Sequence, residues 1–394
     1  MLRSLFSGIS GLRAHQQMMD VTGNNIANVN TTGYKSSQTT FQDTLSQMVR
    51  SAGTPQNGNG GTNPAQVGLG VRLGGIENNF SQGATQNTGR NTDLMIQGDG
   101  FFVVDNAGQQ LFTRNGSFNF DANGSLVTSD GSVVQGWAAN AAGVVNTNAA
   151  QGPVSLPLGT QVPPQASNQA TVTGNLPADT LSPNPIVSSM TTFDAQGNKV
   201  TMSASFAKVN QNQWTLNLTD ANGVTGGPYT IDFTNGATPV ATPSPVTIGG
   251  ITVDVSGLTS YAGMSTITSS ANGSAAGGIQ SFTISPDGTL VGVFSNGLKQ
   301  TLAQLAVATF GNPGGLEKAG DSMYRTTGNS GNAALGTAGS GGRGNLQQGA
   351  LEMSNVDLAQ EFTNLVIAER GFQANSRVIT TSDEILQDLV NLKH

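Results

Sequence analysis

Few residues of this chain are suited to acid–base catalysis or to metal binding. The 394 residues include 2 histidines, His15 and His394, and no cysteine. His15 falls in a stretch with helical spacing and His394 is the last residue, so neither is expected beside a serine and an aspartate as the base of a hydrolase. We therefore expect no catalytic centre, no metal site and no cofactor, and interpret the protein as a non-enzyme.

The aspartates offer one alternative. Two pairs that could lie close together are Asp93 with Asp99 and Asp121 with Asp130. A glycoside hydrolase would hold such a pair in an aromatic-lined groove, and the chain has only 2 tryptophans. The D-A-N-G sequences that begin at positions 121 and 220 lack the later oxygen ligands and the glutamate of a calcium loop. Turns are the better interpretation of these aspartates.

Composition favours short strands and tight turns over a helical enzyme core. Glycine contributes 53 residues, and charged side chains only 10%. The net charge of -7 and the lack of basic clusters exclude the footprint of a nucleic-acid-binding protein. The sequence contains no run of about 18 apolar residues, so we expect no membrane-spanning helix. The N-terminus also lacks the features of a conventional signal peptide, so an extracellular role would require another export route.

Apolar residues at both ends of the chain follow a helical repeat. In the first stretch they are Leu2, Leu5, Ile9, Leu12, Met19 and Ile26, and in the last they are Leu358, Leu365, Phe372, Ile379 and Leu386. Such spacing places each set on one stripe of a helix. A lone helix cannot bury its stripe, so we expect the two ends to pack together and these residues to form a subunit interface. We also expect both ends to be disordered in the free chain and to fold on assembly.

Between the two ends the sequence predicts strands. Turn sequences that end in glycine recur at hairpin spacing, which indicates an all-β meander. Residues 36–50 are expected to be weakly helical or extended, with Phe41, Leu45, Met48 and Val49 as apolar anchors. Composition changes near residue 140, since 11 of the 15 prolines lie between Pro153 and Pro245. This change indicates a second β domain inserted into the first.

The expected organisation is therefore nested. The predicted domains are a terminal helical domain (1–30 and 355–394), a connecting segment (31–70 and 345–354), a first β domain (71–145 and 281–344) and an inserted outer β domain (146–280). The predicted fold class is mainly β with α-helical termini, in which two β domains of barrel or sandwich type accompany a coiled-coil-like pair of helices.

Four blocks of sequence resemble a known family. The segment N-N-I-A-N-V-N-T-T-G-Y-K, which begins at Asn24, is similar to the shared signature of the bacterial flagellar rod and hook proteins. D-L-M-I-Q-G-D-G-F-F-V-V from Asp93, F-T-R-N-G-S-F from Phe112 and G-A-L-E-M-S-N-V-D-L from Gly349 resemble further blocks of that family, in the same order. The signature positions carried over are Asn24, Asn25, Ile26, Ala27, Asn28, Asn30, Thr31, Gly33 and Tyr34.

The resemblance implies a structural protein of the flagellum. A chain of this length with one central insertion is expected among the hook members, which form a curved tube that passes torque from rod to filament and lets exported proteins through its lumen. The implied partners are copies of the chain itself, the distal rod protein, the hook cap and hook–filament junction proteins, and the type III export apparatus. No nucleic acid and no membrane insertion are expected, and the implied location is the extracellular hook of the basal body.

Two alternatives stay open. A distal-rod protein would share the signature and form a straight, rigid shaft, although it is expected to be shorter. A secreted β-rich adhesin would share the composition of the middle but would not need apolar stripes at both termini. Electron microscopy of concentrated protein separates these interpretations, which predict curved tubes, straight tubes and no tubes.

Overall fold

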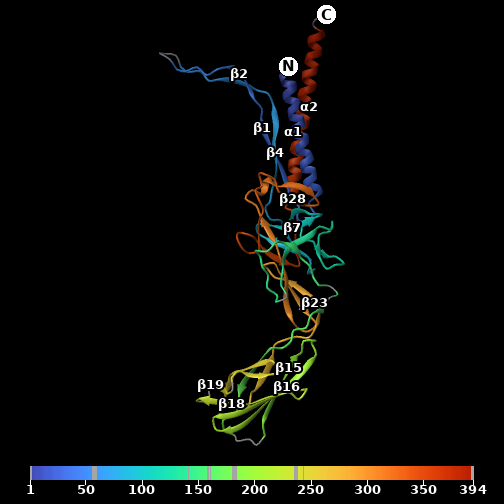
Figure 1. Cartoon of the computed structure of the whole chain (residues 1–394). Helices are drawn as coiled ribbons and strands as arrows, with labels where there is room; N and C mark the ends of the chain where they lie inside the picture. Colours follow the sequence, from blue (N-terminus) through green and yellow to red (C-terminus); the bar gives the residue numbers. More distant parts are fainter. Residues whose placement is uncertain are drawn as a thin grey trace. The chain divides into compact units, whose positions relative to one another are not determined.

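The fold was analysed in a computed structural model of the chain, drawn in Figure 1. The structure describes residues 2–55, 60–140, 142–157, 159, 161–179, 184–234, 238–242 and 244–391. His394 lies outside these residues. The chain divides into two compact units: unit 1 is Met1–Leu156, Thr283–Val291 and Thr301–His394, and unit 2 is Pro157–Phe282 and Gly292–Gln300.

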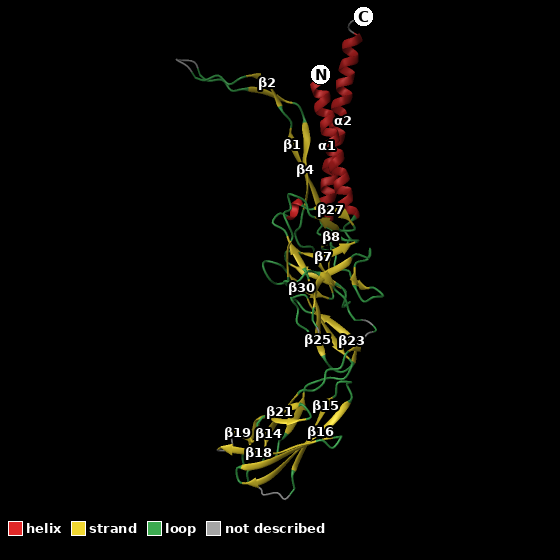
Figure 2. Cartoon of the chain, viewed as in Figure 1, coloured by secondary structure: helices red, strands yellow, loops and turns green. Residues whose placement is uncertain are grey.

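The fold is mainly β, with one helix at each end of the chain, as predicted (Figure 2). Helix α1 spans Leu2–Ala27 and helix α2 spans Leu358–Asn391. The two helices pack as an antiparallel pair, so that both chain ends lie at the same end of the pair (Figure 1). Asp357 caps α2, because its Oδ1 accepts hydrogen bonds from the backbone N–H of Ala359 (2.9 Å) and of Gln360 (3.3 Å).

A two-stranded ribbon follows α1. Strand β1 (Ser37–Asp43) pairs with β4 (Val71–Asn78), and β2 (Ser46–Arg50) pairs with β3 (Ala65–Gly68). Phe41, Leu45, Met48 and Val49 are 38%, 86%, 58% and 65% exposed. Phe41 lies against α1, with its ring centroid 5.9 Å from that of His15. The prediction of apolar anchors is wrong for Leu45, Met48 and Val49, because the part of the ribbon around β2 and β3 is exposed throughout.

The rest of unit 1 is a β body. Its buried aromatic cluster includes Phe101, Phe112, Trp137 and Tyr324. The strands are β5 (Thr85–Asn87), β6 (Leu94–Gln97), β7 (Phe101–Asn106), β8 (Gln109–Thr113), β9 (Asn119–Phe120), β10 (Leu126–Val127), β11 (Val133–Ala138), β12 (Gly152–Pro153), β26 (Val307–Thr309), β27 (Glu317–Gly320), β28 (Met323–Arg325), β29 (Ala334–Gly336), β30 (Asn345–Gln348) and β31 (Ala350–Glu352). A short 3-10 helix covers Pro313–Gly315. Most strands are short and antiparallel, as the recurring turn sequences predicted.

Unit 2 is a β-sandwich. One sheet has the antiparallel order β15 (Ile186–Phe193), β16 (Lys199–Asn210), β17 (Gln213–Asp220), β18 (Thr225–Thr234) and β19 (Thr238–Thr242). The other has the order β20 (Val246–Ile248), β21 (Ile251–Thr259), β14 (Gln169–Asn175) and β22 (Thr268–Ala271), in which β14 and β21 run parallel. Side chains from both sheets share one core, which includes Val172, Phe206, Trp214 and Val253.

Four further strands lie at or near the sequence boundaries between the two units. They are β13 (Gln161–Val162), β23 (Gly277–Ile284), β24 (Thr289–Phe294) and β25 (Lys299–Leu305). The last three each run through a boundary between the two units in the sequence.

Candidate assembly interface and helix junction

The two terminal helices meet along a line of small and polar residues. On α1 this contact line is Ser4, Gly8, Gly11 and His15, and on α2 it is Ser382, Ile379, Asn375 and Gly371. Ser4 Oγ and Ser382 Oγ are 3.4 Å apart. A Cβ added at Gly11 would lie 2.6 Å from Asn375 Oδ1, and one added at Gly371 would lie 2.4 Å from the His15 ring. The helices therefore pack closely because glycine stands at these positions.

The predicted apolar stripe lies beside this line. Leu5, Ile9 and Leu12 each follow a contact-line residue by one position, which turns them about 100° around the helix. Leu5, Leu12, Met19 and Ile26 are partly exposed, and Ile9 is 38% exposed. The stripe is thus not the seam between α1 and α2. The side chain of Leu2 lies outside what the structure describes.

The stripe on α2 behaves similarly, with one exception. Ile379 belongs to the contact line, since its Cγ1 would lie 3.2 Å from a Cβ at Gly8. Leu365, Phe372 and Leu386 are partly exposed and Leu358 is 40% exposed. The structure therefore joins the two ends, as predicted, but places most of the stripe away from their contact line. Its role as a subunit interface stays a prediction.

Additional apolar side chains on the helix pair face away from the chain's own core. The most exposed are Phe6 (66%), Val390 (61%), Ile367 (54%), Phe362 (53%), Val366 (53%), Ile385 (49%) and Val378 (43%). Phe6 lies on α1 and the other six lie on α2. Surface apolar residues are common singly, but several on one helix pair indicate an interaction surface. We call these residues the outer apolar face.

The asparagine-rich signature forms the junction between the helix pair and the β body. Asn25 is 1% exposed. Its Nδ2 donates to Ser37 O (2.8 Å) and to Glu361 Oε1 (3.1 Å). Its Oδ1 accepts from Ser37 N (3.0 Å) and from Tyr34 Oη (3.1 Å). One side chain thus joins the end of α1, the start of the ribbon and the first turn of α2.

The other signature residues surround Asn25. Asn28 closes the end of α1 by donating from Nδ2 to Asn24 O (2.9 Å), and Thr31 donates to Asn28 Oδ1 (3.0 Å). Gly33 has a φ of +67°, and a Cβ there would lie 2.5 Å from Asn115 N, so the segment can pass the β body only as glycine. Ile26 is partly exposed, whereas Ala27 and Asn30 are exposed.

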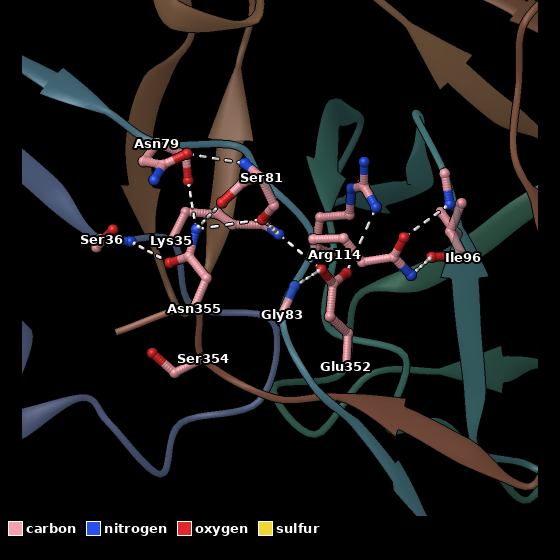
Figure 3. A network of polar contacts seen from close by, with 12 residues as sticks. Lys35, Ser36, Asn79, Ser81, Gly83, Ile96, Arg114, Glu352, Ser354 and Asn355 are labelled. Atoms are coloured by element: carbon pink, nitrogen blue, oxygen red, sulfur yellow. Dashed lines mark hydrogen bonds and ion pairs between the residues drawn. The ribbon is translucent and has the colours of Figure 1, made fainter. Parts of the chain in front are cut away.

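A buried ionic triad lies next to the signature (Figure 3). Glu352 Oε1 accepts from Lys35 Nζ (2.6 Å) and from the Gly83 backbone N–H (2.9 Å), and Glu352 Oε2 lies 3.4 Å from Arg114 Nη1. The side chains of Lys35 and Glu352 are 0% exposed, and that of Arg114 is 3% exposed. Lys35 Nζ also donates to Ser81 O (2.7 Å).

The triad is shielded from water, and this shielding changes its proton affinities. Burial lowers the pKa of Lys35 below its ordinary value, and the opposing effect of Glu352 does not restore it. Burial likewise lowers the pKa of Arg114. Sequence reasoning included Lys35 in the signature segment but missed that Lys35, Arg114 and Glu352 pair. Each stands inside a matched sequence block, which is the signal that could have found them.

Three of the four aspartates weighed as catalytic pairs accept hydrogen bonds from residues close to them in the sequence. Asp121 Oδ1 accepts from the backbone N–H of Asn123 (3.0 Å) and of Ser125 (2.7 Å). Asp93 is 1% exposed and accepts from Thr88 Oγ1 (2.6 Å), and Asp130 accepts from Ser132 Oγ (2.5 Å). His15 packs between Gly371 of α2 and the Phe41 ring, whose centroid is 5.9 Å away.

Comparison with known proteins bears directly on these elements. Residues 5–35 match the family described as flagella basal body rod protein, residues 95–175 match the flagellar hook protein FlgE/F/G D1 domain, and residues 347–392 match the flagellar basal body rod FlgEFG protein C-terminal family. The chain is 36% identical to the flagellar hook protein FlgE of Borreliella burgdorferi over 446 residues, with 100% of both chains covered. The chain belongs to the flagellar hook protein family.

Further relatives agree with this assignment. The FlgE hook protein of Escherichia coli is 36% identical over 413 residues, with 98% of each chain covered. The basal-body rod protein FlgG of Bacillus subtilis is 34% identical over 394 residues, with 100% of each covered. A crystal structure of the Helicobacter pylori hook protein FlgE2 matches the fold with a TM-score of 0.54 at 14% identity, covering 68% of this chain and 100% of that one. The resemblance seen in the motifs is thus confirmed.

The family matches at the two ends coincide with the helix pair and its junction. Residues 5–35 contain most of α1, Asn25, Gly33 and Lys35, and residues 347–392 contain Glu352 and α2. Over the described residues, neither helix of this hook-family chain has the length and hydropathy of a membrane span. All three members of the triad, Lys35, Arg114 and Glu352, therefore lie within the matched ranges, as do most residues of both helices.

Proposed function

We propose that this chain is the structural subunit of a flagellar hook and polymerises with copies of itself through its terminal helices. The outer apolar face supports this proposal above all, because Phe6, Phe362 and Val366 are more than half exposed in the single molecule. Covering such side chains releases about 1.5–3 kcal/mol each. Identical subunits joined by contacts that do not close into a ring form an open helical polymer.

The ribbon offers a second surface for neighbouring copies. All residues of β2 and β3 are exposed, including Met48 and Val49. Two-stranded ribbons are only marginally stable in water, so a neighbouring subunit would add the missing layer. With the stripe residues of both helices, the ribbon gives each subunit apolar contacts on more than one side.

The same arrangement accounts for a tube with a lumen. At about 1.5 Å per residue, the 26 residues of α1 and the 34 of α2 are about 39 Å and about 51 Å long. Helices of this length would line an inner wall through which unfolded flagellar proteins pass. The weakly charged surface, with 10% charged residues, lets subunits slide because few ion pairs hold one register. Such a tube bends while it passes torque from rod to filament.

The proposed setting follows from this role. The subunit would leave the cell through the flagellar type III export apparatus and assemble outside it. Its neighbours at the two ends of the tube would be the distal rod protein and the hook–filament junction proteins, with the hook cap present during growth. We further propose that residues 1–30 and 355–394 form the assembling domain and that they order only when neighbours cover the outer apolar face.

Electron microscopy of the concentrated full chain tests this function. We expect curved tubes from the unmodified protein and none from a variant with Phe362→Ser and Val366→Ser, because both side chains are exposed and their loss should not unfold the chain. A matched control carries Val187→Ser and Val209→Ser in unit 2, where the side chains are 60% and 51% exposed. Tubes that form equally well from both variants would contradict the helical interface.

A distal-rod role is the second candidate. It is favoured by the similarity to the rod protein FlgG of Bacillus subtilis, which spans the whole chain. A rod subunit would give straight tubes of one fixed shape in the same experiment. Straight tubes from the unmodified chain would therefore replace the hook proposal by the rod proposal.

A further inference from the structure

The buried triad of Lys35, Arg114 and Glu352 is poorly suited to stabilising the fold. It holds two cations and one carboxylate, all removed from water. Arg114 Nε is buried and has no hydrogen-bond partner within the described part of the chain. Burial lowers the pKa of both cations, so pairing with Glu352 does not fully offset their desolvation. Buried ion clusters of this kind are often no more stable than apolar side chains of the same size.

The triad is, in contrast, well suited to fixing directions. Lys35 follows the end of α1, Glu352 precedes the start of α2, and Arg114 comes directly after β8 of the β body. Charge-assisted hydrogen bonds depend on angle as well as distance, whereas apolar contacts tolerate rotation. Around Glu352, Gly33 N also donates to Glu352 O (2.7 Å), and Gly83 N donates to Oε1 (2.9 Å). One residue thus holds both points at which the helices leave the β body.

Asn25 and Ser37 supply the second point of attachment. The four hydrogen bonds of Asn25 connect α1 with Tyr34, with Ser37 of β1 and with Glu361 of α2. Ser37 Oγ in turn accepts from Lys318 Nζ of β27 in the β body (2.8 Å). Two separate polar attachments restrict the orientation of the helix pair more strongly than either attachment alone. The junction therefore has the parts of a fixed joint between the helix pair and the β body of unit 1.

We propose that Lys35, Arg114 and Glu352 are positioning residues that set the orientation of the helix pair on the β body, and thereby the curvature and helical geometry of the assembled tube. This inference rests on the proposed function, because orientation matters only when copies stack. In a polymer, a small change of angle in every subunit accumulates along the tube. A cluster that costs stability is thus retained for the shape of the assembly.

The test separates stability from shape. Replacing all three residues with methionine (Lys35→Met, Arg114→Met, Glu352→Met) keeps the approximate volume and removes every charge. The matched control removes an exposed pair in the same unit by Glu317→Gln and Arg325→Gln; that pair has a 2.6 Å contact and side chains 52% and 47% exposed. For each protein, urea unfolding of the full chain gives stability, and electron microscopy gives tube curvature, diameter and helical repeat.

We expect the methionine variant to unfold at the same or a higher urea concentration than the unmodified chain. Its tubes should be altered or mixed in curvature, or the folded chain should fail to form tubes. The control should match the unmodified chain in both measurements. Methionine-variant tubes of unchanged geometry would overturn the proposal, and so would a variant that unfolds at markedly lower urea, since the triad would then serve stability. If the unmodified chain forms no tubes, the proposed function fails instead.

Discussion

The contact line between the terminal helices makes a quantitative prediction at Gly11. In Gly11→Ala the new Cβ would lie 2.6 Å from Asn375 Oδ1 and 2.8 Å from Asn375 Cγ and Nδ2. Overpacking of this kind costs about 1–3 kcal/mol, while replacing glycine by alanine within a helix returns about 0.5–1 kcal/mol. The expected net effect on the helix pair is a loss between about 0 and 2.5 kcal/mol.

If the helices fold only on assembly, the free energy of packing α1 against α2 is part of the free energy of polymerisation. A loss of stability in the helix pair should then weaken polymerisation by the same amount. The critical concentration for tube formation should rise by up to about 60-fold in Gly11→Ala, at about 1.4 kcal/mol per tenfold change. Sedimentation of assembled protein measures it. Gly23→Ala is the matched control on the same helix, since a Cβ at Gly23 meets nothing within 4 Å. It should lower the critical concentration by about 2- to 5-fold.

A double-mutant cycle isolates the contact between position 11 and Asn375. Asn375→Ala deletes the atoms that the new Cβ would meet, so Gly11→Ala should become favourable in that background. The hydrogen bond lost from Asn375 Nδ2 to Gly371 O (2.8 Å) affects both Asn375→Ala proteins equally and cancels. We expect a coupling of about 1–3 kcal/mol, or about 5- to 150-fold in critical concentration. A coupling below about twofold would refute the pairing of α1 and α2 along this line.

Three further predictions follow from the helices, the junction and the triad. Deleting residues 1–20 or 375–394 should abolish polymerisation in electron micrographs while circular dichroism still shows folded β domains; a truncated chain that forms tubes would contradict this. Gly33→Ala, at a φ of +67° and with its Cβ 2.5 Å from Asn115 N, should lose at least about 2 kcal/mol more stability in urea than Gly131→Ala, at a φ of +89° with open space. The pKa of Lys35 is lowered below 10.5 in the folded chain, so the unfolded chain binds more protons and the free energy of unfolding should rise with pH towards that value. The rise between about pH 7 and pH 9.5 should be smaller in Lys35→Met. Equal slopes of stability against pH in the two proteins would contradict this prediction.

The sequence predicted the elements better than their contacts. Both helices were predicted within a few residues, because apolar repeats and the asparagine-rich segment after Ile26 are local signals. The contact line was missed because Ser4, Gly8 and Gly11 are small and polar, and a search for apolar spacing passes over them. Their own spacing of four and three residues is the signal that could have revealed them.

The junction shows a different limit. The signature from Asn24 to Tyr34 was found as a motif, but its role depends on Ser37, Glu361 and Asn115, which approach it only in the folded chain. Pairing between Lys35 and Glu352 spans 317 positions. Nothing local in the sequence indicates a partner that far away. In the ribbon, Leu45 and Met48 were predicted to be apolar anchors and are exposed.

One physical reason accounts both for the exposure of the ribbon and for the position of the apolar stripe beside the helix contact line. A chain that buried its apolar helix residues within one molecule would leave no apolar area for its neighbours, and assembly would lack a driving force. Here glycine and serine take the intramolecular contact, so Phe362 and Val366 stay available. Small contact residues also bury little area, which keeps the isolated helix pair weak. If the termini fold on assembly as proposed, the small residues of the contact line would couple their folding to polymerisation, and strengthening the isolated helix pair should reduce that coupling.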